Sequence, residues 1–189
     1  MNTKYLAVVA MLASVFLAGC ASAPQMLKVE PVLVLDNLKG ITIPVGLVIS
    51  DKRENLNLLG YRTAKNESQI GFSESVAKSM GESIQAALIQ QGVRISTDGK
   101  SATRLEVQLH ELSYTTPDES WVSSIEMKAE VLLVVSRSEA VLKKRFNANK
   151  KQGVIAAPGK EFNQKFMNTL ISELINKALN DKEIASFLK

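Results

Sequence analysis

An alternation of apolar and polar residues over long stretches places the strongest constraint on how this 189-residue chain folds. In Thr103–Tyr114 and Val122–Ser136, apolar residues recur at odd positions and charged or polar residues stand between them. A period of two predicts strands with one buried face and one face in water. A third strand-like segment, Ala140–Asn149, follows after the short connection Arg137-Ser138, which predicts a hairpin.

Two helices are predicted from apolar residues spaced four apart. The first stripe comprises Phe72, Val76, Met80, Ile84 and Leu88. The second stripe, within a helix from about Lys160 to Asn180, comprises Phe162, Phe166, Leu170, Leu174 and Ala178. Ser73 is expected to cap the first helix and Gly92 to end it, while Asp181 is expected to cap a terminal turn.

Shorter strands are expected at Val29–Leu35, Ile41–Ser50 and Leu58–Tyr61. No internal repeat or second linker interrupts residues 29–189, so this part is predicted to be a single domain. The predicted fold class is α+β, an antiparallel-rich sheet with two amphipathic helices packed on one face.

The outer face of the predicted sheet carries an apolar end at Leu132 and Val134. Opposite charges attract across strands, so we expect Glu130 to lie between Arg104 and Arg145 on the neighbouring strands. Such a row of charges makes one end of the outer face polar. The apolar end at Leu132 and Val134 is then the expected binding surface for a protein or envelope component. The predicted partner surface is therefore on the sheet.

The first twenty residues have the layout of a secretory signal. Lys4 supplies one positive charge, and the 12 residues of Tyr5–Phe16 carry none. This apolar run is too short to cross a bilayer. It is followed by Leu-Ala-Gly-Cys at 17–20, which contains the single cysteine of the chain.

Leu-Ala-Gly-Cys resembles the lipobox of bacterial lipoproteins. In that family the signal, here residues 1–19, is cleaved before the cysteine, whose thiol takes a diacylglycerol and whose new amino group is acylated. The resemblance implies lipid attachment at Cys20. The residue after the cysteine is Ala21 and not Asp. The resemblance therefore also implies the outer membrane of a Gram-negative bacterium, with the domain facing the periplasm. Residues 20–28 are then the lipidated cysteine and a short tether, and the alternative is a plain secretory signal with a chance cysteine.

Several patterns bear on chemistry. A net charge of +4, from 23 basic and 19 acidic residues, is too small and dispersed to predict nucleic-acid binding. One His and one Cys are too few for a zinc site. Ser75 and Lys78 match Ser-x-x-Lys without its companion motifs, Gly153–Lys160 has the wrong spacing for a phosphate loop, and His110 has no implied nucleophile. We therefore expect no enzyme activity, catalytic residue, metal or cofactor.

The order of elements resembles the YajG-type family of uncharacterised outer-membrane lipoproteins. The features that carry this resemblance are the lipobox, the Val29-Glu30-Pro31 strand, the helix through Met80, the strand Leu105–Leu109 and the ending Phe187-Leu188-Lys189. It implies a periplasmic domain without known activity, and it carries over no functional residue except Cys20. A similar layout occurs in lipoproteins that assist lipid-transport systems. Two functions are thus expected, a non-enzymatic binding module or an auxiliary subunit of an envelope lipid-transport system.

Overall fold

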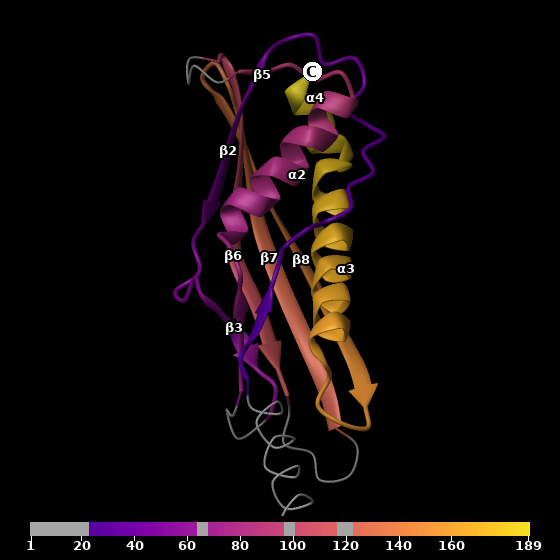
Figure 1. The fold of residues 1–189 in the computed structure, drawn as a ribbon. Coiled ribbons are helices and arrows are strands. Elements are labelled where there is room, and N and C mark those ends of the chain that lie inside the picture. Colours follow the sequence, from indigo (N-terminus) through magenta and orange to yellow (C-terminus); the bar gives the residue numbers. More distant parts are fainter. Residues whose placement is uncertain (1–22, 64–67, 97–100, 117–122) are drawn as a thin grey trace, which may run out of the picture.

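The computed structural model describes residues 23–63, 68–96, 101–116 and 123–189, which form one α+β unit (Figure 1). The strands are β1 (Gln25–Leu27), β2 (Val45–Asp51), β3 (Leu58–Tyr61), β4 (Gln69–Phe72), β5 (Ile95–Ser96), β6 (Thr103–Thr115), β7 (Ser123–Arg137) and β8 (Ala140–Val154). The helices of the described ranges are α2 (Val76–Gln90), α3 (Lys160–Leu179) and α4 (Lys182–Leu188). The predicted signal and Cys20 lie outside the described residues.

The eight strands of the described ranges belong to one mixed sheet, and β6 is its central strand. The pairs β1–β4, β2–β5, β2–β6 and β3–β6 are parallel, whereas β3–β4, β6–β7 and β7–β8 are antiparallel. Most pairings are therefore parallel, and the prediction of an antiparallel-rich sheet is wrong. Alternation along a strand reports which face is buried. It carries no information about the direction of the neighbouring strand.

The three long strands β6, β7 and β8 pair antiparallel with one another, in a register that differs from the predicted one. Glu130 lies opposite Glu111 on β6 and Asn147 on β8, while Arg104 lies opposite Ser136. A bulge between Leu109 and Glu111 shifts the β6–β7 register and exchanges the two faces of β6. Beyond it, the even-numbered Leu112 and Tyr114 become buried.

The predicted charge row is reduced to a single diagonal ion pair between Arg145 and Glu130. Leu132 lies opposite Arg145, and Val134 lies opposite Glu106 and Lys143. Both apolar side chains are half-buried and have charged cross-strand neighbours. The outer face therefore lacks the separate apolar end that the register prediction required.

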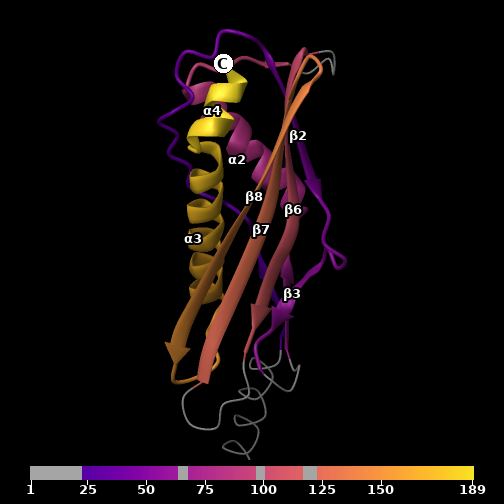
Figure 2. The same ribbon diagram turned by 180° about the vertical axis from the view of Figure 1, so that it is seen from behind.

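The described part of the chain has three helices, one more than predicted. They cover the same face of the sheet (Figures 1 and 2). Helix α2 packs against β2, and α3 and α4 pack against β7 and β8. Both predicted apolar stripes face the core, except that Phe162 is 41% exposed. Ser75, not Ser73, caps α2, whereas Gly92 ends it as predicted, with a φ of +85°. The predicted terminal turn is a separate helix, α4. Asp181 caps it as predicted, because its side chain accepts hydrogen bonds from the N–H groups of Glu183 and Ile184.

Residues 28–36 form an extended strap along α3, so the strand predicted at Val29–Leu35 does not join the sheet (Figure 1). Val29 and Leu35 are buried, while Val32 and Val34 are 73% and 61% exposed. The alternation is that of a strand, but backbone N–H groups of the strap donate to side chains of α3. The preceding β1 lies within the predicted tether, so the fold begins closer to Cys20 than expected.

Candidate functional site

Among the residues that the structure describes, the edge of β2 that faces away from β6 is largely open. β2 pairs with β6 from Val45 to Asp51, whereas the described part of β5 pairs only with Val45 and Gly46. The N–H of Val45 donates toward β5, to the carbonyl of Arg94 at 2.9 Å, and the N–H of Lys52 donates toward β6. Backbone groups alternate between the two edges of a strand. The N–H and C=O groups of residues 47, 49 and 51 therefore face the open edge.

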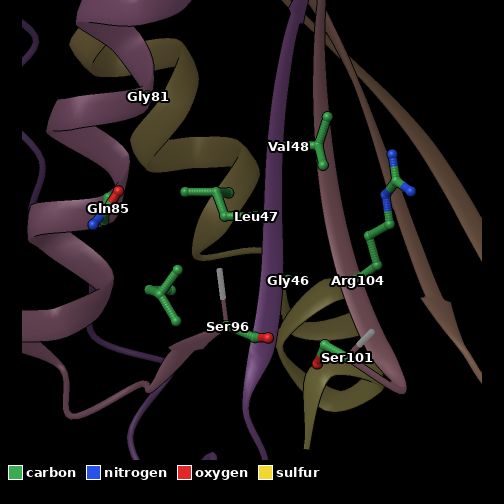
Figure 3. A pocket seen from close by; sticks show the side chains of 9 residues that line it. Gly46, Leu47, Val48, Gly81, Gln85, Ser96, Ser101 and Arg104 are labelled. Atoms are coloured by element: carbon green, nitrogen blue, oxygen red, sulfur yellow. The ribbon is translucent and has the colours of Figure 1, made fainter. Parts of the chain in front are cut away.

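A groove of about 430 Å³ lies beside this open edge, between α2, β2 and the start of β6 (Figure 3). Its lining includes Gly46, Leu47, Val48, Gly81, Gln85, Ile95, Ser96, Ser101 and Arg104. Figure 3 shows Leu47 pointing toward α2, with Val48 and Arg104 on the opposite side of β2. We call this surface the α2–β2 groove.

One glycine of the α2–β2 groove lets two elements approach closely. A Cβ at Gly81 would lie 3.3 Å from Cγ1 of Ile49, so only glycine allows α2 to sit this near β2 without a shift of the neighbouring side chain. A Cβ at Gly46 would make an ordinary contact, 3.4 Å from Cβ of Ser101.

The polar groups around the groove suit hydrogen bonding to a peptide. Ser101 donates from Oγ to the carbonyl of Pro44 at 2.5 Å, and Gln85 is exposed on α2. Arg104 is 52% exposed, with Nη2 3.9 Å from Oε2 of Glu106. The arrangement offers an open strand edge, an amide and a guanidinium, which are groups for binding an extended chain.

The residues weighed for catalysis make local contacts within their own elements. Ser75 Oγ accepts from the N–H of Lys78 at 3.4 Å as the α2 cap. Nε2 of His110 lies 3.1 Å from Oε1 of Gln108 on the same strand. The segment from Gly153 contains the turn between β8 and α3. Among the described residues, no three His, Cys, Asp or Glu side chains gather as a metal site, and no helix is long and apolar enough to cross a membrane.

The end of the fold nearest Cys20 is held by buried polar contacts. Gln25, 7% exposed, donates from Nε2 to the carbonyl of Pro158 at 3.2 Å. Its Oε1 accepts from Nδ2 of the fully buried Asn163 at 2.8 Å. Two residues before Gln25, the carbonyl of Ala23 accepts a hydrogen bond from Oγ of Ser68 at 3.1 Å. No sequence signal indicated these contacts or the groove, because each joins residues that are distant along the chain.

The fold is similar to that of a solved Xanthomonas campestris protein assigned to family-model DUF330. The two chains are 11% identical, with 87% of this chain and 95% of that one covered at a TM-score of 0.52. A minor lipoprotein from Acinetobacter baumannii is 12% identical, with 82% and 92% covered and a TM-score of 0.41. None of the curated proteins compared with the chain matches its sequence. The model of one family matches residues 36–189, and the chain therefore belongs to that family, the Lipoprotein_16 family of uncharacterised lipoproteins.

Proposed function

We propose that this lipoprotein is anchored to the outer membrane through a lipid on Cys20, faces the periplasm and acts as a non-enzymatic binding module. Leu-Ala-Gly-Cys at 17–20 and the family membership support the lipid, and Ala21 supports the outer membrane. The closer relationship to the YajG-type lipoproteins belongs to the same proposal.

The open edge of β2 is the observation that carries the binding function. An unpaired strand edge presents a row of N–H and C=O groups that another extended chain can pair with. Here that edge lies beside the α2–β2 groove, where Gln85 and Arg104 stand near the incoming chain. The proposed ligand is an extended segment of a partner protein, added to the sheet as a strand next to Leu47 and Ile49.

The alternative function, an auxiliary subunit of an envelope lipid-transport system, uses the same surface. In that case the added strand belongs to a subunit of the transport complex. The identity of the bound protein separates the two functions.

The anchor is tested by Cys20→Ser. Removing the thiol removes the acyl attachment, so we expect no palmitate incorporation and loss of the protein from the membrane fraction. Ala21→Asp retains the lipid and is expected to move the protein from the outer to the inner membrane in a density gradient. A Cys20→Ser protein that still incorporates palmitate contradicts the anchor, and unchanged fractionation of Ala21→Asp contradicts the sorting.

The binding edge is tested by Leu47→Pro, with Leu47→Ala as its matched control. Both changes remove the leucine side chain, but only proline removes the N–H that faces the open edge. A photo-crosslinking residue at Gln85 is expected to form an adduct in intact cells that Leu47→Pro abolishes and Leu47→Ala retains. The same crosslinker at Lys128, on the outer face of β7, is expected to form no such adduct. Equal adducts at both positions, or an adduct unaffected by proline, would exclude binding at the β2 edge.

A further inference from the structure

The turn between β8 and α3 carries an uncharged apolar run on the surface. Residues 154–157 are Val-Ile-Ala-Ala, and the side chains from Ile155 to Ala157 are exposed. Ile155 is fully exposed, at 106% of its reference area. Consecutive exposed apolar residues are unfavourable in water unless something covers them. We call residues 154–159 the anchor-side turn.

The anchor-side turn is joined directly to the start of the described chain. Its Pro158 carbonyl accepts from Nε2 of Gln25 at 3.2 Å and from Nε of Arg62 at 3.3 Å. β1 begins and β8 ends at the same end of the molecule, opposite the C-terminus (Figure 1). The turn therefore lies where the chain leads back to Cys20.

The few residues between Cys20 and the first described residue limit how far the anchor-side turn can lie from a lipid on Cys20. Ala23 is already held by Ser68, through the 3.1 Å hydrogen bond to its carbonyl. Three residue steps separate Ala23 from Cys20, and at about 3.6 Å a step they reach no more than about 11 Å. A lipid on Cys20 thus keeps the anchor-side turn at the level of the phospholipid headgroups.

The charges around the turn fit a phospholipid surface. Lys151 and Lys160 are exposed on either side of it, and Glu161 follows at the start of α3. Phe162, 41% exposed, stacks on Phe166 with ring centroids 5.8 Å apart. Apolar side chains flanked by lysines are typical of segments that rest in a membrane interface, because lysines stay at the headgroups while apolar groups enter the acyl region.

We propose that the anchor-side turn inserts into the leaflet that holds the lipid on Cys20, with Ile155 entering the acyl region. This inference rests on the proposed lipid anchor. It gives the domain a second membrane contact, which fixes its orientation and holds the α2–β2 groove away from the bilayer toward the periplasm.

The insertion is tested with a fluorescent label at Ile155→Cys, in the lipidated mature protein reconstituted into phosphatidylethanolamine and phosphatidylglycerol vesicles. Cys20 is the single cysteine of the chain and its thiol is occupied by the lipid, so an environment-sensitive label reacts only at the introduced thiol. The control is Val141→Cys, which is also exposed and lies at the other end of β8. At about 3.4 Å a residue, the 13 steps of β8 from Val141 to Val154 place the two labels roughly 44 Å apart.

The label at position 155 is expected to emit at shorter wavelength and to be quenched by lipids brominated on their acyl chains. The label at position 141 is expected to show neither effect. If the protein floats with the vesicles and both labels behave alike, the insertion is overturned while the anchor stands. If the protein does not float with the vesicles, the anchor and the insertion are both overturned.

Discussion

Tyr114 lies at the same end of the molecule as Gln25 and is 3% exposed, at the end of β6. Burial of the phenol raises the pKa of Tyr114 from 10.0 to about 12, although Thr116, Arg62 and Asn163 lower it in part. The folded protein therefore keeps a proton that the unfolded chain releases near pH 10. Stability that depends on this proton is complete below pH 10 and is lost as the pH rises toward 12.

The first prediction follows from this difference in pKa. The free energy of unfolding of the mature protein is expected to fall more steeply between pH 10 and 12 than that of the Tyr114→Phe variant, which has no phenol to ionise. Urea unfolding followed by circular dichroism measures both, and Tyr61→Phe is the control that should keep the steeper fall. Equal slopes for the mature protein and Tyr114→Phe would show that the phenol is accessible to water.

At the scale of elements, the strap is held by a ladder of polar side chains on α3 and its C-cap residue Asn180. The acceptors, spaced four residues apart along the helix, are Gln164, Asn168, Ser172, Asn176 and Asn180. They receive the N–H groups of every second strap residue, Lys28, Glu30, Val32, Val34 and Asp36. Four helical residues rise about 6 Å and two extended residues span about 6.6 Å. This polar stripe therefore substitutes for the edge of a neighbouring strand.

The second prediction concerns Asn176, which serves the ladder in both directions. Its Oδ1 accepts from the N–H of Val34 at 2.8 Å, and its Nδ2 donates to the carbonyl of Val32 at 3.1 Å. Asn176→Ala is expected to cost about 1 kcal/mol and to speed hydrogen exchange at the Val34 amide. Lys177→Ala, at the next and exposed position, should change neither. Unchanged exchange at Val34 in Asn176→Ala would mean that the ladder does not hold the strap.

At the scale of the whole molecule, β1 connects the predicted tether to both layers. It pairs with β4 in parallel from Gln25 to Leu27, and its Leu27 is fully buried in the core. β1 also contacts α3. Residues close to the predicted lipid attachment site at Cys20 are therefore part of the fold.

The third prediction compares two shortened chains. A chain that starts at Ala21 keeps β1 and is expected to unfold like the full mature domain. A chain that starts at Lys28 lacks β1 and Leu27 and is expected to be less stable by about 2–5 kcal/mol, the usual cost of emptying a large buried apolar site. Urea unfolding of both chains decides this. Equal free energies of unfolding for the two chains would contradict the prediction and show that β1 belongs to the tether and not to the fold.

The sequence by itself determined most of the local elements and the face that each one buries, apart from β6 beyond its bulge and the strap. The apolar stripes of α2 and α3, the three long strands, and the ends set by Gly92 and Asp181 follow from spacing and capping, which are properties of residues near one another in the chain. The lipobox is equally local, and it indicates the anchor at Cys20 without any knowledge of the fold.

Only the tertiary structure decided which elements became neighbours. The bulge near Glu111 changed the register between β6 and β7, and the strap paired with polar side chains along α3 instead of with a strand. The charged Arg53 is only 9% exposed, beside Asp51 and Phe72. The open edge of β2 and the turn at Pro158 likewise exist through contacts between distant segments. Such contacts depend on how whole surfaces pack and on where backbone groups find hydrogen-bond partners. A period of two or four along one segment carries no information about either.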